Sequence, residues 1–143
     1  MVKYDDASWH YGSDFPADLP SEAGATHIGI FVAWCLLNGL AGDLHIQQFP
    51  DMYSKLRKRE MTPGAWFIAA CDEKFTDGDL SELGNAFAKS YYGGDAPQYF
   101  EDYEAIVGPH LESPYHVVDS WETFEKIAPV ICTRFETWGN QGA

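Results

Sequence analysis

An apolar stretch without a charged residue runs from Ile28 to Ala41, and Asn38 is its only clearly polar member. Such a run predicts a helix that is buried on most of its circumference. It is shorter than the roughly 20 apolar residues that a membrane-spanning helix needs, so it indicates a core helix. We place this central helix at about residues 27–41, with Thr26 as its N-cap and Gly42 as the residue that ends it.

Apolar residues at spacings of three and four predict further helices along the chain. They cover residues 51–60, 63–74, 80–92, 96–107 and 121–138. Thr62 followed by Pro63 is typical of an N-cap and the first helical position. Pro129 predicts a kink or a break in the last helix, because proline lacks the backbone N–H that a helix interior requires.

The remaining segments favour strands only weakly. Ser113–Asp119 is the best strand candidate, since it is short and partly β-branched. We therefore expect a mainly α fold, a compact single domain with little or no sheet. The alternative is an α+β fold in which Leu44–Phe49 pairs with Tyr115–Asp119.

The first 22 residues form a separate stretch rich in Asp, Pro and aromatic residues. Pro16 and Pro20 forbid a continuous helix there, yet the stretch is too apolar for a solvated tail. We expect an ordered, irregular arm that lays its aromatic side chains on the core. No repeat or linker divides the chain, so residues 1–143 are interpreted as one domain.

The net charge of −13 limits the classes of partner that we expect for this protein. Nucleic acid and anionic membrane surfaces would be repelled, so neither is expected as a partner. A basic partner protein fits this charge, and so does a role of the charge in solubility alone. The three cysteines lie in apolar stretches and form no CxxC pair, which is typical of reduced thiols in a cytoplasmic protein. No signal peptide pattern opens the sequence.

Motifs for known chemistry are missing from the sequence. It contains no GxSxG elbow, no Walker A loop and no GxGxxG, so we expect neither an enzyme nor a nucleotide cofactor. The loop from Asp72 to Glu82 invites an EF-hand interpretation, but glycine falls at its seventh position rather than its sixth. Calcium is therefore not expected.

Asp5, Asp6, His10 and His27 are the candidate metal ligands, because carboxylates and imidazoles coordinate metals. Their spacing matches no standard chelating motif, so we expect structural roles and no metal. The alternative is a metal-dependent enzyme or binder that uses these four residues.

Charge patterning offers a second candidate surface. No Lys or Arg occurs between Lys89 and Lys126, and acids alternate there with tyrosines. Carboxylates can steer a basic protein toward the surface, and aromatic side chains can anchor it. An ordinary acidic surface is the alternative. The partner-binding residues that we predict are Asp95, Tyr99, Glu101, Asp102, Tyr103, Glu104, Glu112, Asp119 and Glu122.

The N-terminal segment resembles a known group of proteins. The block YDDASWH at Tyr4–His10, followed by GATHIG at Gly24–Gly29, resembles a family of small, acidic, uncharacterised bacterial proteins. The resemblance covers the chain to about residue 45. It implies a member of the toxin-immunity repertoire, encoded beside secreted antibacterial effectors.

These observations lead to one function with two alternatives. We expect a cytoplasmic immunity protein that binds and occludes a cognate effector toxin with a basic surface, such as a nuclease. The alternatives are the metal-dependent enzyme or binder described above and an adaptor domain for another basic protein.

Overall fold

The computed structural model describes residues 2–10, 15–93 and 98–142. Within these residues the fold is mainly helical with one small two-stranded sheet, which confirms the mainly α prediction. In chain order the elements are β1 (Lys3–Asp6), η1 (Ala7–His10), η2 (Ser21–Ala25), α1 (Thr26–Leu37), η3 (Leu44–Gln48), α2 (Pro50–Arg57), α3 (Pro63–Cys71), β2 (Lys74–Thr76), η4 (Asp77–Asp79), α4 (Glu82–Tyr91), α5 (Gln98–Val107), η5 (Pro114–His116) and α6 (Trp121–Gly142).

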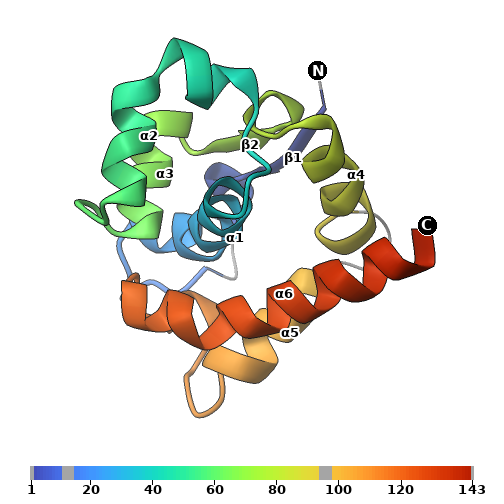
Figure 1. The fold of residues 1–143 in the computed structure, drawn as a ribbon. Helices are drawn as coiled ribbons and strands as arrows, with labels where there is room; N and C mark the ends of the chain where they lie inside the picture. Colours follow the sequence, from blue (N-terminus) through green and yellow to red (C-terminus); the bar gives the residue numbers. More distant parts are fainter. Residues whose placement is uncertain (1, 11–14, 94–97, 143) are drawn as a thin grey trace.

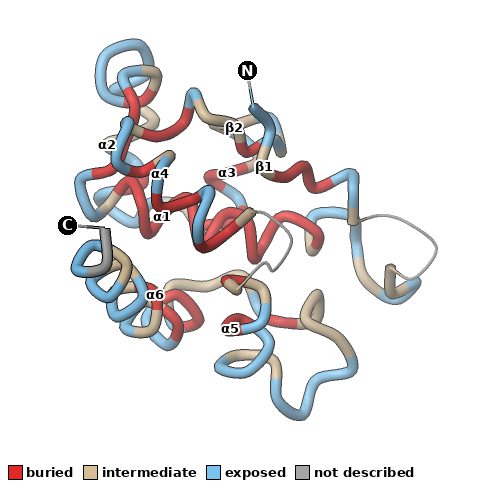
Figure 2. The backbone as a smooth tube through the Cα atoms, turned by 90° about the vertical axis from the view of Figure 1, so that its right-hand side faces the viewer, coloured by how far each residue is buried: buried red, intermediate tan, exposed pale blue. Residues whose placement is uncertain are grey.

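Helix α1 lies at the centre of the molecule. In Figure 1, α2 and α3 lie on one side of it, α4 on the other, and α5 and α6 below it. Every residue of α1 except Leu37 is buried, and Figure 2 shows it as an almost continuous buried segment. The apolar run therefore forms the core helix that the sequence predicts.

The ends of α1 differ from the prediction. Thr26 is its first helical residue rather than an N-cap, and no side chain caps this end. The helix ends at Leu37 instead of continuing to residue 41. Gly39 takes a φ of 81°, a left-handed conformation that glycine adopts without steric cost, so the chain turns before it reaches Gly42.

The sheet forms elsewhere than the α+β alternative placed it. β1 pairs antiparallel with β2, and Asp5 lies opposite Phe75. The segment 44–48 is a single helical turn and residues 114–116 form a 3-10 turn, so neither expected strand exists. The arm is also more regular than expected, because residues 3–10 form β1 and η1.

Two further predictions concern the start of α3 and the proline inside α6. Thr62 is the N-cap of α3 as predicted, and its side chain accepts a hydrogen bond from the Ala65 N–H. Helix α6 runs through Pro129 without a break. Pro129 is exposed, so the carbonyl that loses its helical donor lies at the solvent side of the helix.

None of the described helices combines the length and the apolarity needed to cross a bilayer.

Candidate functional site around Asp5, His10 and His27

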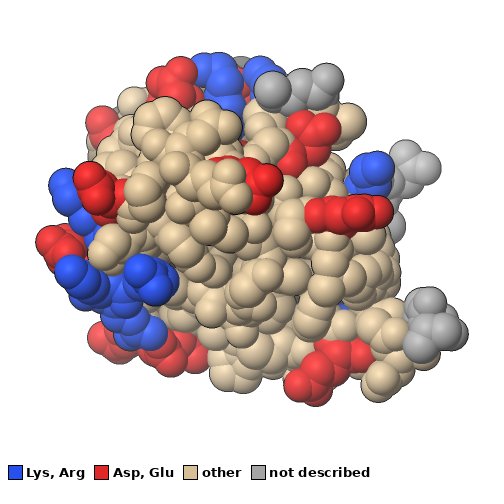
Figure 3. All heavy atoms as spheres, turned by 45° about the horizontal axis from the view of Figure 1, so that its top comes forward, with Lys and Arg blue, Asp and Glu red and all other residues tan. Residues whose placement is uncertain are grey.

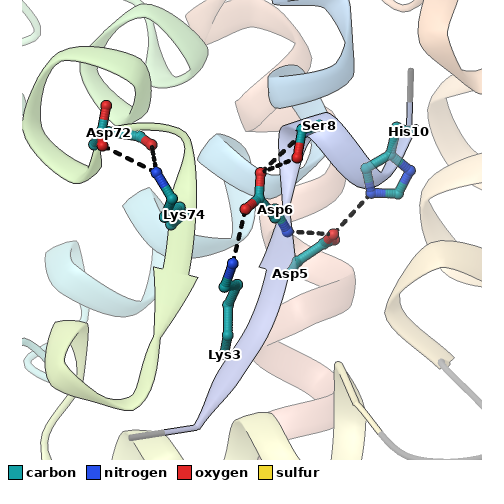
Figure 4. A network of polar contacts seen from close by, with 7 residues as sticks. All are labelled: Lys3, Asp5, Asp6, Ser8, His10, Asp72 and Lys74. Carbon is teal, nitrogen blue, oxygen red and sulfur yellow. Dashed lines mark hydrogen bonds and ion pairs between the residues drawn. The ribbon is translucent and has the colours of Figure 1, made fainter. Parts of the chain in front are cut away.

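Strand β1 sends Asp5 and Asp6 to different surroundings, because successive side chains of a strand point to opposite faces. Asp6 accepts hydrogen bonds from the N–H and hydroxyl of Ser8 and pairs with Lys3 at 3.0 Å (Figure 4). These contacts fix the turn into η1. Asp6 therefore has a structural role, whereas Asp5 points toward His10.

Asp5 is the centre of a buried polar cluster, with only 7% of its surface exposed. Its Oδ1 lies 2.8 Å from His10 Nε2, and its Oδ2 accepts a hydrogen bond from the Tyr92 hydroxyl. Burial opposes ionisation of this carboxyl, but the hydrogen bond with His10 and the proximity of His27 outweigh burial and hold the pKa of Asp5 well below its usual range. The carboxylate is therefore ionised at neutral pH.

The two histidines reach Asp5 from different elements. His10 ends η1, and His27 lies in the first turn of α1, where it is 2% exposed. Their rings meet edge to face with centroids 4.5 Å apart. His10 Nδ1 lies 2.8 Å from the Tyr115 hydroxyl, so both of its ring nitrogens have partners.

His27 differs from His10 in one respect. Its Nε2 lies 3.6 Å from Asp5 Oδ2 and has no hydrogen-bond partner among the described residues. Burial lowers the pKa of His27 despite the attraction of Asp5, which favours the neutral imidazole. A buried polar atom without a partner is uncommon and indicates a functional constraint or a missing ligand.

A cavity of about 410 Å³ adjoins this cluster. Its size lies in the range of small-ligand pockets, roughly 300–1,000 Å³. Its lining is mostly aromatic and comprises Tyr4, Asp5, His10, Tyr92, Gly93, Tyr99, Phe100 and Tyr115. Aromatic side chains thus surround the polar groups of Asp5 and His10 at this cavity.

The structure brings together three of the four candidate metal ligands. Asp5, His10 and His27 each offer a ligand atom, and these atoms lie within 4.8 Å of one another. Asp6 is turned away from them. Sequence analysis named these residues, but it missed Tyr92 and Tyr115, which complete the cluster from distant segments and follow no recognisable spacing.

The predicted partner-binding residues separate into exposed and internal groups. Glu101, Glu104, Glu112 and Glu122 are exposed. Asp95 lies outside the described residues.

Both predicted tyrosine anchors are internal. Tyr99 is 1% exposed and donates its hydroxyl to the His27 carbonyl at 2.7 Å, and Tyr103 is fully buried. Their periodic spacing on α5 marks the face that packs on the core, so they are not available to an incoming partner.

Two predicted acids hold the fold together instead of facing solvent. Asp102 accepts two hydrogen bonds of 3.0 Å from Arg134 and one from the Tyr91 hydroxyl, which ties α5 to α4 and α6. Asp119 accepts from the N–H groups of Gly64 and Ala65 at the start of α3. Neither role was evident from sequence, because each partner lies far along the chain.

A second buried cluster joins His45, Cys71 and Asp79. His45 Nε2 lies 2.8 Å from Asp79 Oδ1, and Cys71 Sγ lies 3.6 Å from the same oxygen. The other oxygen of Asp79 accepts from the Thr76 N–H in a capping box. These contacts close the η4 turn against α3 and η3.

Most of the chain is similar to a known protein family. A family model described as a domain of unknown function (DUF7832) matches residues 3–117. The chain belongs to the DUF7832 family. The match runs from β1 to the end of η5, so Asp5, His10 and His27 lie inside the DUF7832 region and α6 lies outside it. No curated protein and no solved structure matches the chain.

Proposed function

We propose that this DUF7832 protein is a cytoplasmic immunity protein that binds a cognate antibacterial effector toxin with a basic surface, such as a nuclease, and occludes it. The observation that carries the proposal is an apolar groove with acidic neighbours at the α5–α6 end of the molecule. The family description itself names no partner and no reaction.

The groove lies where α5, the loop after it and the start of α6 meet. It encloses about 570 Å³, and its lining includes the apolar Ile106, Leu111 and Val118 together with the charged Glu122 and Lys126. The first three are 43%, 42% and 69% exposed, unusually high values for large apolar side chains beside one another. Exposed apolar groups that gather in this way are typical of interaction surfaces.

Exposed glutamates lie on the same elements as this groove, and Glu122 is one of its lining residues. Glu101 and Glu104 lie on α5, Glu112 lies on the following loop, and Glu122 begins α6. An apolar centre with a charged rim is the usual anatomy of a protein interface. The groove residues take the anchoring role that the sequence assigned to Tyr99 and Tyr103.

The largest group of basic residues lies in one short segment. Lys55, Arg57, Lys58 and Arg59 fall within five residues at the end of α2 and directly after it. Arg59 pairs with Glu125 and lies 4.5 Å from the ring of Trp121, so part of this basic group is used within the fold. On the face in Figure 3, Lys and Arg lie at the left, at the top and at the right, and Asp and Glu are dispersed among them. No Lys or Arg occurs between Lys89 and Lys126, which supports α5 and the loop after it as the surface for a basic partner.

Charge reversal tests the proposal. The variant Glu101→Lys, Glu104→Lys, Glu112→Lys is to be co-expressed with the cognate toxin domain that the proposal requires. We expect association at least about tenfold slower than for the wild type, because carboxylates that steer the encounter become repulsive. Protection of the cells should fall accordingly. Asp102 stays unchanged, because its reversal would break the contacts with Arg134 and Tyr91.

A matched control carries the same charge change on other elements. Asp43→Lys, Asp51→Lys, Glu82→Lys alters three exposed acids that lie before η3, on α2 and on α4. It should bind and protect like the wild type. Equal behaviour of both triple variants would exclude the α5–α6 surface, and capture of a non-toxic basic protein would favour the adaptor alternative.

A further inference from the structure

We propose that Asp5, His10 and His27 form a binding site for a divalent transition-metal ion, with the two histidines coordinating through Nε2. The site is independent of the α5–α6 groove. It rests on the convergence of three donors from β1, η1 and α1 and on the unpartnered Nε2 of His27.

The donor distances fit such an ion. Zinc bonds of about 2.0–2.1 Å in tetrahedral geometry place neighbouring ligand atoms about 3.3 Å apart. The cluster has 2.8 Å between His10 Nε2 and Asp5 Oδ1, and 3.6 Å between His27 Nε2 and Asp5 Oδ2. Small side-chain rotations would equalise these distances, and the ion would replace the hydrogen bond between His10 and Asp5.

His27 provides the observation that a hydrogen-bond network alone does not explain. In such a network each buried polar atom has a partner, whereas His27 Nε2 has none and is aimed at the carboxylate of Asp5. The side chain of His27 is 3% exposed, so bulk water does not satisfy it. A metal ion between the three residues would give this nitrogen its partner.

The surrounding hydroxyls would hold the ligands in place. The Tyr115 hydroxyl contacts His10 Nδ1 at 2.8 Å, which orients the ring so that Nε2 points to Asp5. The Tyr92 hydroxyl donates to Asp5 Oδ2. Such outer contacts fix ring orientation and ligand basicity in known metal sites.

The ligand set would leave coordination positions free. Three protein ligands with an open position are typical of zinc sites that bind an exchangeable water or small molecule, and two histidines with one carboxylate also hold non-haem iron(II). Asp5 and His10 line the 410 Å³ cavity, so an ion that they hold would border it.

The other two clusters of possible ligands are weaker candidates. In the His45–Cys71–Asp79 cluster the third possible ligand is a thiol, and burial, reinforced by Asp79, raises its pKa, which opposes the thiolate that a metal binds. His45 Nδ1 also lacks a partner within the described part of the chain, but the ring nitrogen that faces Asp79 is Nε2, which is paired, so the unpartnered nitrogen of His45 is not directed at the possible ligands. The group of Asp18, Glu112 and His116 includes two exposed carboxylates.

Zinc titration of the purified, chelator-treated full chain tests the site. Calorimetry should give one zinc ion per chain for the wild type, and cobalt(II) should give visible absorption bands of low-symmetry coordination by nitrogen and oxygen. In His27→Gln and in His10→Gln we expect zinc affinity to fall at least about tenfold, because each variant removes one ligand. Magnesium should not compete, since it prefers oxygen ligands.

His45→Gln is the matched control, because His45 is also a buried histidine paired with an aspartate. It should bind zinc like the wild type. Absence of zinc binding in the wild type, unchanged affinity in both cluster variants, or loss in His45→Gln alone would each overturn the proposal. His10 is only partly buried, so His10→Gln decides the question if His27→Gln fails to fold. The charge-reversed triple variant should keep its zinc affinity, which separates this test from that of the proposed function.

Discussion

Gly29 shows how one residue sets the distance between two helices. A Cβ atom at this position would lie 2.6 Å from the Pro63 carbonyl oxygen and 2.9 Å from Gly64 Cα. Both obstacles are backbone, so neither can rotate away. The absence of a side chain at Gly29 therefore allows α3 to pack directly on α1.

Gly29→Ala should destabilise the protein by about 1–3 kcal/mol, because the added methyl group forces α1 and α3 apart. Urea denaturation followed by circular dichroism measures the change. Gly139→Ala is the control, since no atom lies within 4 Å of its Cβ position. That substitution should stabilise α6 by up to about 1 kcal/mol through helix propensity. Equal effects of the two substitutions would contradict the close-packing argument.

At the scale of elements, α3 depends on a residue more than 50 positions away. The first N–H groups of a helix have no partner within it, and they attract negative charge. Thr62 caps Ala65, and the carboxylate of Asp119 accepts from Gly64 N–H at 2.8 Å and Ala65 N–H at 3.2 Å. The chain before α6 is thereby fixed to the start of α3.

Asp119→Ala should cost about 1.5–3 kcal/mol, because hydrogen bonds to a charged acceptor are lost and the amides of α3 are left without it. Thermal and urea unfolding measure the loss. Glu112→Ala changes an exposed acid from the same predicted surface and should stay within about 0.5 kcal/mol of the wild type. A neutral Asp119→Ala would show that α3 does not need this cap.

The whole molecule carries a net charge of −13, and this charge acts against the folded state. Like charges in a folded chain repel one another, and the repulsion is felt more strongly when few counterions screen it. The ion pairs between exposed side chains, such as Lys126 with Glu122 at 3.7 Å, offset little of this repulsion. Stability should therefore depend on ionic strength.

Raising sodium chloride from about 10 mM to about 500 mM should raise the Tm by about 3 °C or more, because the Debye length shrinks severalfold. Differential scanning calorimetry measures the shift, and choline chloride should give the same result if screening is the cause. The charge-reversed triple variant, which is less negative, should respond less. A Tm that is independent of salt or falls with it would contradict this account.

The sequence by itself determined where the long helices lie and which one is at the centre, whereas the short turns at 44–48 and 114–116 and the end of α3 at Cys71 differ from the prediction. The uncharged run 28–41 predicted α1, and Thr62 with Pro63 marked the start of α3, because periodicity and capping are local properties. It also named Asp5, His10 and His27 as chemically distinctive residues.

Only the tertiary structure decided which of these residues meet and which are buried. β1 and β2 pair across about 70 residues, and Asp5, His10 and His27 converge from three elements. Tyr99 and Asp102 were predicted to face a partner, because acids and tyrosines alternate in this segment, yet packing of α5 on the core places them inside. Local pattern sets the faces of an element, whereas the neighbour that covers each face depends on contacts between residues far apart in sequence.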